Sequence, residues 1–366
     1  MTIDGFRAIV PAGGAGTRLW PLSRAGSPKF LHDLTGAGRT LLQSTWDRMV
    51  PLTGPDGVLL VTGAAHATAV REQLPALRED NLLLEPSPRD SMAAIGLAAA
   101  VLARRDGDAV IGSFAADHVI TGDDVFAEAV RQAVVTAREG YVVTLGITPD
   151  HPSTAFGYVR SGDSLGVEEA PLAQRAAEFV EKPDAETASR YVAGGGYRWN
   201  AGMFVSRVDV LLGHLAEQKP DLHSGLVEIA LAWDTDRRAE VLDATWPGLE
   251  KIAIDHAIAE PVAAAGGVAV VPGSFGWDDV GDWHSLCGLL PEAEEGPRVL
   301  GHGDVVSSDA GGLVVPAGGR LVVVVGLDDV VVVDTPDALL VTSRARAQDV
   351  KAVVGRLRAA GRTDLL

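Results

Sequence analysis

The chain has 366 residues, 47% of them hydrophobic, a formal net charge of −18 and one cysteine, Cys287. This length suggests one large and one smaller domain at about 150 residues per domain. The acidic balance argues against nucleic-acid binding, which needs a basic surface, and no apolar run reaches the ~18 residues that a membrane span requires. The N-terminus lacks the apolar segment of a secretion signal, and a lone cysteine forms no internal disulfide. We therefore expect a cytoplasmic protein that binds neither nucleic acid nor membrane.

Apolar runs and amphipathic stretches alternate over residues 6–150. This alternation predicts an α/β fold with a Rossmann-like, mostly parallel sheet covered by helices on both faces. In such sheets, ligands bind at the carboxyl ends of the strands. The predicted strands are Arg7–Pro11, Val58–Thr62, Leu82–Glu85, Ala109–Ala115 and Tyr141–Ile147, and the predicted helices are Thr40–Val50, Ala64–Leu74, Arg89–Arg105 and Asp123–Glu139.

The first strand runs into a glycine-rich turn, Ala12–Gly16, which is followed by Thr17 and Arg18 and, further on, by Lys29. Glycines let backbone N–H groups approach an anion closely, and fixed cations complete a phosphate-binding arrangement. Two common phosphate motifs do not fit. The dinucleotide fingerprint needs a third glycine where Leu19 stands, and a P-loop needs Lys and Ser/Thr directly after the glycines.

The segment 13–23, with Pro28 and Lys29, resembles the sugar nucleotidyltransferase signature G-G-x-G-T-R-L-x-P-L-[ST]…P-K. Its W-P-L-S-R ending resembles the mannose-1-phosphate guanylyltransferase branch of that family. The resemblance implies that Arg18 neutralises the β- and γ-phosphates of a nucleotide and that Lys29 meets the transferring α-phosphate. It also implies nucleotide-binding roles for Ala12, Gly13, Gly14, Gly16 and Thr17.

The segment Glu85–Ser91 resembles the E-P-x-x-R-N-T-A stretch of the guanylyltransferases, with Asp90 where the family has Asn. Guanine presents two donors on one edge, and a carboxylate can accept both. Asp90 and Ser91 are therefore candidate nucleotide-binding residues. The same sequence also reads as an ordinary helix start, with prolines followed by Asp and Ser.

Two carboxylates follow apolar strands in segments that resemble family elements. Asp117 lies in a P-A-D-H-like stretch, and Asp279 lies in a W-x-D-V-G-x-W-like stretch. The resemblance implies that both bind Mg²⁺, which prefers oxygen ligands and often takes only one or two carboxylates. We expect the two at strand ends of one sheet. The alternative for Asp117 is a helix cap or turn, His118 is expected to be structural or substrate-orienting, and Asp282 is expected to cap a helix that begins at Trp283.

Three further segments resemble the sugar-binding elements of the family. They are Leu145–Ile147 in L-G-I-x-P, the strand Ala176–Val180 with Glu181-Lys182-Pro183 in F-V-E-K-P, and Trp199–Phe204 in W-N-S-G-M-F. The resemblance implies sugar-phosphate binding by Gly146, Glu181, Lys182 and Asn200, with Glu181 accepting sugar hydroxyls and Lys182 meeting the phosphate. The alternatives are a solvated surface ion pair and an asparagine satisfied at a buried strand end.

The composition changes after the acidic linker Glu292–Gly296. Helices are predicted between residues 207 and 260, including Glu250–Ile258, whereas the residues after the linker are short β-branched runs and a final basic helix, Arg344–Ala360. We therefore expect a catalytic domain at 1–290 and a β-rich domain at 297–366. The resemblance implies a left-handed β-helix-like coil for the second. Its predicted strands are Leu313–Val315, Leu321–Val325, Val330–Val333 and Leu339–Val341.

The implied reaction is the Mg²⁺-dependent transfer of GMP from GTP to mannose 1-phosphate, which gives GDP-mannose and pyrophosphate. Catalysis of this kind rests on positioning and charge stabilisation. Two alternatives stay open: the same chemistry on another hexose 1-phosphate and nucleotide, and a non-catalytic regulatory homologue that senses sugar nucleotides. A homodimer is compatible with the sequence.

Overall fold

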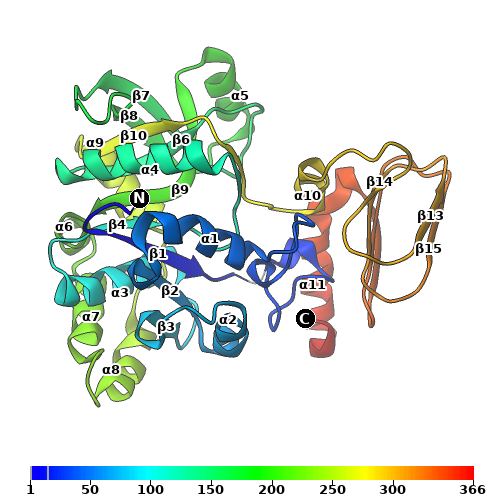
Figure 1. The fold of residues 1–366 in the computed structure, drawn as a ribbon, viewed down its shortest axis with the longest axis horizontal. Coiled ribbons are helices and arrows are strands. Elements are labelled where there is room, and N and C mark those ends of the chain that lie inside the picture. The colour runs from blue at the N-terminus through cyan, green and yellow to red at the C-terminus, as the bar shows by residue number, and fades with distance from the viewer. Residues whose placement is uncertain (1, 15) are drawn as a thin grey trace.

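A computed structural model describes residues 2–14 and 16–366 (Figure 1). A nine-stranded sheet forms the main body, in the order β3-β2-β1-β4-β9-β6-β10-β8-β7. Its strands are β1 (Phe6–Ala12), β2 (Val58–Gly63), β3 (Leu82–Glu85), β4 (Val110–Ser113), β6 (Val142–Ile147), β7 (Tyr158–Ser164), β8 (Gln174–Val180), β9 (Tyr197–Arg207) and β10 (Val268–Gly273). The strands predicted within residues 6–150 are all confirmed.

Helices cover both faces of this sheet (Figure 1). One core packs α3, α6, α7 and α8 against it, and the other packs α1, α2 and α4. The helix α3 is buried on several sides, because every residue from Met92 to Leu102 is buried. The helices are α1 (Leu41–Thr53), α2 (Ala67–Gln73), α3 (Asp90–Arg105), α4 (Asp123–Arg138), α5 (Ala185–Gly194), α6 (Val208–Gln218), α7 (Pro220–Ala232), α8 (Arg238–Thr245), α9 (Glu260–Ala264), α10 (Trp283–Leu289) and α11 (Val350–Ala359).

The α/β class is confirmed, but the sheet is mixed rather than mostly parallel. β3, β2, β1 and β4 run parallel, whereas β9 runs antiparallel to β4, β6 and β7. β7 and β8 form an antiparallel pair joined by a short connection, as antiparallel strands can be. The expectation rested on the alternation of strands and helices over residues 6–150, whereas β9, which lies after that region, inserts between β4 and β6 and runs antiparallel to both.

The predicted helix Glu250–Ile258 is wrong in its first four residues and in its type. Residues 250–253 are not helical, and a short π-helix occupies Asp255–Ala259 before α9 begins at Glu260. Elsewhere in the segment 207–260, α6, α7 and α8 confirm the expected helices. No helix in the described ranges is long and apolar enough to cross a lipid bilayer.

The C-terminal residues form a coil of short parallel strands. Successive strands alternate between two sheets, so that β12, β14 and β16 pair in parallel in one sheet and β13 and β15 in the other. β17 closes the first sheet in antiparallel fashion. The strands are β12 (Arg298–Val299), β13 (Val305–Ser308), β14 (Gly312–Pro316), β15 (Val322–Val325), β16 (Val330–Asp334) and β17 (Leu339–Ser343). The four predicted strands are confirmed.

This coil is joined to the main body through the signature segment, with α10 and α11 lying between them (Figure 1). Trp20 Nε1 donates to the Leu365 carbonyl at 2.7 Å, and Trp283 Nε1 donates to the Trp20 carbonyl at 3.1 Å. Arg24 forms a bidentate ion pair with Asp337, with both N–O distances 2.6 Å. Hydrogen bonds and an ion pair with C-terminal residues therefore hold the segment after the glycine turn in place.

We expect Asp282→Ala to lower the free energy of unfolding by about 1–2 kcal/mol. Asp282 caps α10 as predicted, because its Oδ1 accepts from the backbone N–H groups of His284 (2.7 Å) and Ser285 (3.0 Å), and its Oδ2 accepts from Gln348 before α11. Urea unfolding followed by tryptophan fluorescence measures the loss. Asp282→Asn keeps a capping oxygen and should lose less; equal stability of Asp282→Ala and the native protein would contradict the role.

Candidate active site

The glycine turn leaves β1 at the carboxyl-end edge of the sheet. Gly13 and Gly14 are exposed, and a Cβ on either would meet no other atom within 4 Å. Gly16 is different: its φ is 54°, and a Cβ there would lie 2.8 Å from Lys29 Cβ and 2.9 Å from Ser23 Oγ. The open part of the turn can approach a ligand, while Gly16 packs directly on Lys29. Ala15, the middle of the turn, lies outside the described residues.

Lys29 is the centre of the first cluster of predicted residues. It is only 6% exposed, and its Nζ lies 2.7 Å from Asp117 Oδ2 and donates to the Asp279 backbone carbonyl at 2.5 Å. Arg18 lies on a 3₁₀ turn, Thr17–Leu19, and its buried Nε has no hydrogen-bond partner among the described residues. The structure thus brings together the predicted cation and both predicted metal ligands.

A small antiparallel ribbon outside the main sheet places the two carboxylates together. β5 (Val119–Thr121) pairs with β11 (Gly276–Asp278), and Val119 stands opposite Asp278. Asp117 precedes β5 and Asp279 follows β11, so the two lie at the same end of the ribbon. The two carboxylates therefore do flank strand ends of one sheet, but it is this small one and not the main sheet, whose strand β4 ends at Ser113, four residues before Asp117.

The loop after Asp279 is held in an unusual backbone conformation. Val280 has φ 47°, which is a genuine outlier for a β-branched residue. Asp278 Oδ1 accepts from the Val280 N–H at 2.6 Å and from Ser285 Oγ at 2.6 Å. Asp278 thus supports the loop that carries Asp279, the expected metal ligand.

The electrostatics of the two carboxyl groups differ. Burial raises the pKa of Asp279 to about 6; the charge of Lys29 acts against this rise, and the neighbouring Asp278 and Asp117 add to it. For Asp117, burial acts in the same direction, but the charge and hydrogen bond of Lys29, with the charge of His118, outweigh it and the pKa is lowered. Burial lowers the pKa of His118 to about 4, and its Nδ1 accepts from Trp277 Nε1 at 3.2 Å. This hydrogen bond fixes the His118 ring against Trp277, which is compatible with the expected structural or substrate-orienting role.

Asp117 and Asp279 fit a magnesium ion that is completed by substrate phosphates. Mg²⁺ commonly takes one or two carboxylates together with phosphate oxygens and water. No group of three or more His, Cys, Asp or Glu side chains suited to a metal occurs in the described part of the chain. The donor set therefore fits a substrate-assisted ion rather than a closed protein cage.

The second cluster gathers the predicted sugar-phosphate residues. Lys182 Nζ lies 2.5 Å from Glu181 Oε1; the Glu181 side chain is 7% exposed and that of Lys182 is 60% exposed. Burial lowers the pKa of Lys182, but the hydrogen bond and charge of Glu181, with Asp255 and Asp90, raise it above its usual value. Gly146 lies in β6, and a Cβ there would collide with Val270 and Arg198, so this glycine is packed tightly.

Asn200 is buried and fully engaged in hydrogen bonds. Its Oδ1 accepts from Thr144 Oγ1 (2.7 Å) and from the Gly202 N–H (3.1 Å), and its Nδ2 donates to Asp255 Oδ1 (2.8 Å). The structure therefore agrees with the alternative of a satisfied asparagine and adds a residue that the sequence motifs missed, Asp255. The π-helix that begins at Asp255 is a structural sign that the sequence did not carry, since such turns are frequent at functional sites.

The predicted nucleotide residues on α3 lie nearer the sugar cluster than the glycine turn. Asp90 has φ 65° and contributes to the charge around Lys182. Ser91 Oγ accepts from the Ile254 N–H at 2.9 Å. The motifs gave no role to Glu85, at the carboxyl end of β3. Its buried Oε1 has no hydrogen-bond partner in the described ranges, and burial raises its pKa to about 7.

Aromatic rings connect the two clusters. Phe156 contacts Trp199 and Trp277 edge-on, with centroid distances of 5.1 and 5.0 Å, and Trp277 contacts His118 at 5.5 Å. Trp199 precedes Asn200, and Trp277 lies two residues before Asp279. Ring contacts through Phe156, which lies in the loop before β7, therefore link the segments that carry the sugar and metal clusters.

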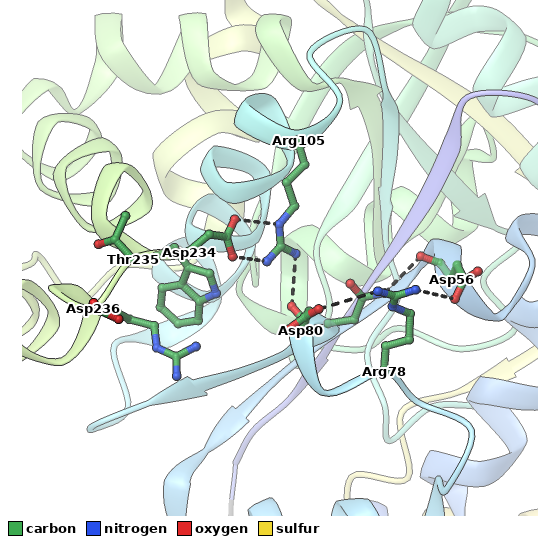
Figure 2. A pocket seen from close by; sticks show the side chains of 10 residues that line it. Asp56, Arg78, Asp80, Arg105, Asp234, Thr235 and Asp236 are labelled. Carbon is green, nitrogen blue, oxygen red and sulfur yellow. Dashed lines mark hydrogen bonds and ion pairs between the residues drawn. The ribbon is translucent and has the colours of Figure 1, made fainter.

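A cavity of about 760 Å³ lies away from this site, at the amino ends of β2 and β3 (Figure 2). Two of its three arginines are paired with carboxylates: Arg105 forms two bonds to Asp234, and Arg78 lies between Asp56 and Asp80, as the dashed lines show, while Arg238 lies over the Trp233 ring. Charges compensated in this way offer little to an anionic ligand, so this cavity is not the candidate active site.

Comparisons with known proteins agree with this arrangement. Residues 7–295 match the nucleotidyl transferase family, and residues 303–357 match the MannoseP isomerase/GMP-like beta-helix domain. Mannose-1-phosphate guanylyltransferase of Escherichia coli K12 is 40% identical over 97% of this chain and 74% of its own length. The alginate biosynthesis protein AlgA of Pseudomonas aeruginosa is 36% identical over 97% and 73%.

A solved structure of a related protein has the same fold over nearly the whole chain. The Thermus thermophilus protein described as mannose-1-phosphate geranyltransferase superposes with a TM-score of 0.85 at 34% identity, covering 97% of this chain and 99% of its own. An α/β sheet with this glycine turn and these two clusters defines an enzyme of the nucleotidyltransferase class. The chain belongs to the mannose-1-phosphate guanylyltransferases of the nucleotidyl transferase family.

We expect Glu85→Gln to stabilise the ligand-free protein at pH 8 and not at pH 4. The folded-state pKa of Glu85, about 7, exceeds its ordinary value of 4.5. Below that ordinary value the Glu85 carboxyl group is protonated in both the folded and the unfolded protein, so it does not lower the stability. As the pH rises towards 7 the unfolded chain ionises first, so the native protein loses stability, on the order of 3 kcal/mol once the pH exceeds 7.

Thermal unfolding at the two pH values tests this expectation. The melting temperature of Glu85→Gln should exceed that of the native protein by several degrees at pH 8 and match it at pH 4. Glu168→Gln, an exposed glutamate, is the control and should give the same difference at both pH values. A Glu85→Gln difference that does not change with pH would contradict the raised pKa.

Proposed function

We propose that the chain catalyses the Mg²⁺-dependent transfer of GMP from GTP to mannose 1-phosphate, and that residues 1–290 form the catalytic domain while residues 297–366 form a second domain. The observation that carries this proposal is the position of Lys29, which packs on Gly16 of the glycine turn and contacts both Asp117 and Asp279. The names of the E. coli relative and of its Salmonella typhimurium counterpart support the choice of substrates.

The reaction needs positioning and charge rather than a protein nucleophile. An oxygen of the sugar 1-phosphate is already anionic and attacks the α-phosphorus of GTP while pyrophosphate leaves. The exposed backbone of Gly13 and Gly14 would bind the triphosphate, Arg18 its β- and γ-phosphates, and Lys29 the α-phosphate. Asp117 and Asp279 would hold the magnesium ion, which supplies charge neutralisation at the transferring phosphate.

The structure supports Glu85 over Asp90 as the reader of the guanine base. Glu85 stands beside Gly63 of β2, and β2 pairs with β1, which ends at the glycine turn. Two strand spacings, roughly 10 Å, separate the turn from Glu85. A buried carboxylate with an unsatisfied oxygen is suited to the N1–H and N2–H donors of guanine. Asp90, in contrast, contributes to the charge around Lys182 in the sugar cluster.

A pyrophosphate-release assay tests the function directly. GTP, ATP, UTP and dTTP are each combined with mannose 1-phosphate and with glucose 1-phosphate, with Mg²⁺ or with EDTA. We expect GTP with mannose 1-phosphate and Mg²⁺ to give the highest rate, with GDP-mannose as product. A higher rate with another pair would make the chain a different nucleotidyltransferase. No release with any pair would favour a non-catalytic homologue.

We expect Lys29→Met to reduce kcat roughly 10²- to 10³-fold while GTP affinity changes far less. Methionine keeps the buried apolar stem and removes the charge that meets the α-phosphate in the transition state. Pyrophosphate release gives kcat, and calorimetric titration gives the dissociation constant of GTP. Lys219→Met is the control, because Lys219 pairs with Glu250 at the surface. A kcat within threefold of the native value would remove Lys29 from this role.

A further inference from the structure

Asp255 places a second carboxylate beside Glu181 in the sugar cluster. It is the first residue of the π-helix Asp255–Ala259. Desolvation raises its pKa to about 6, and the Glu181 charge acts in the same direction. No basic side chain lies within ion-pair distance of Asp255 in residues 2–14 and 16–366. Glu181 is paired with Lys182, but Asp255 has no such partner, and two carboxylates held close together in this way destabilise the protein without a ligand. We therefore expect a ligand to bind here.

A chain of buried hydrogen bonds holds Asp255 in this position. Thr144 and the Gly202 N–H fix the orientation of the Asn200 amide, which donates to Asp255 Oδ1 at 2.8 Å. On the other side, Ser91 Oγ accepts from the N–H of Ile254, the residue before Asp255. The side-chain bond from Asn200 is made to Oδ1, and no side chain of the described residues donates to Asp255 Oδ2.

The π-helix also ties this element to the Glu181 backbone. Glu260, directly after the π-turn, accepts from the Glu181 N–H at 3.3 Å and pairs with His256 at 2.8 Å. Lys182, which follows Glu181, has φ 47° and presents its ammonium group to Glu181, with Asp255 close enough to raise its pKa. The element therefore holds two carboxylates and one exposed cation close to one another.

We propose that Asp255 is a second sugar-binding carboxylate, which accepts a hydrogen bond from one hydroxyl of the hexose ring while Glu181 accepts from another and Lys182 binds the phosphate. Asn200 is then a positioning residue that acts through Asp255. The inference rests on the proposed function, because it assigns the acceptor site for a hexose 1-phosphate. Two acceptors at fixed positions recognise the configuration of two hydroxyls, which gives a physical basis for selectivity among hexose 1-phosphates.

The test combines Asp255→Asn with deoxy substrates. Removing one charge-assisted hydrogen bond should lower kcat/KM for mannose 1-phosphate about 10- to 100-fold, while KM for GTP stays within about twofold. The native enzyme and the variant are then assayed with the 2-, 3-, 4- and 6-deoxy analogues of mannose 1-phosphate. For one analogue, kcat/KM should be low with the native enzyme and should fall by less than about a further threefold in Asp255→Asn. The reason is that this analogue lacks the hydroxyl that Asp255 binds.

A merely structural role gives a different pattern. The loss in kcat/KM from Asp255→Asn and the loss from the missing hydroxyl would then multiply for every analogue. That result, or an unchanged kcat/KM for mannose 1-phosphate, overturns the proposal. Glu181→Gln should show the same coupling with a different hydroxyl. Asp255→Ser, which keeps a smaller acceptor, gives the second measurement if the asparagine variant unfolds, with thermal unfolding as the check.

The control is Asp334→Asn, a buried carboxylate in the C-terminal coil that pairs with Arg320 and should leave both KM values unchanged. Assays of the native enzyme distinguish failure of the proposed function from failure of the role of Asp255. If it releases no pyrophosphate with GTP and any hexose 1-phosphate, the proposed function fails. If it is active and Asp255→Asn shows no coupling with any analogue, only the role of Asp255 fails.

Discussion

The buried Lys29 ammonium group is the constraint on which the site depends. A charge that is 6% exposed is stable only when it is paired and hydrogen-bonded. Asp117 supplies the countercharge, and the Asp279 carbonyl supplies a second acceptor. These partners come from segments about 90 and 250 residues further along the chain, so the pairing cannot form until the sheet and the ribbon β5–β11 have both assembled. The pairing therefore ties together three segments that are distant in the sequence.

The same constraint explains why the C-terminal coil is attached where it is. Lys29 packs on Gly16, and the segment between them contains Trp20 and Arg24. Trp20 bonds to Trp283 on one side and to Leu365 on the other, and Arg24 pairs with Asp337. A loop that carries several glycines has many conformations in isolation. Contacts with the coil reduce these conformations, so residues far from the substrates help to preorganise the phosphate-binding turn.

Short motifs were sufficient to predict which residues of this site gather, but not how. The sequence placed Lys29, Asp117 and Asp279 in one site, and the structure brings them into contact. It could not show the ribbon β5–β11, because three-residue strands carry no periodic signal. The antiparallel course of β9 was missed for a related reason: its Trp-Asn-Ala-Gly segment interrupts the apolar run with a glycine at φ 66°.

Glu85 and Asp255 were missed because the role of a single carboxylate depends on its burial and its neighbours. The π-turn changes which residues share a face, and so directs Asp255 towards Asn200 and Glu181.

Backbone strain and electrostatic repulsion are concentrated at the residues that face the proposed substrates. Three of the four non-glycine residues with positive φ in the described ranges, Asp90, Lys182 and Val280, lie in the predicted motifs. Each such conformation costs of order 1–3 kcal/mol and persists only where surrounding contacts enforce it. The raised pKa values of Asp255 and Asp279 add a further cost to the free protein. In the proposed function, donors and cations that bind with the substrates would relieve that cost, so part of the stability that the fold gives up would return as binding energy.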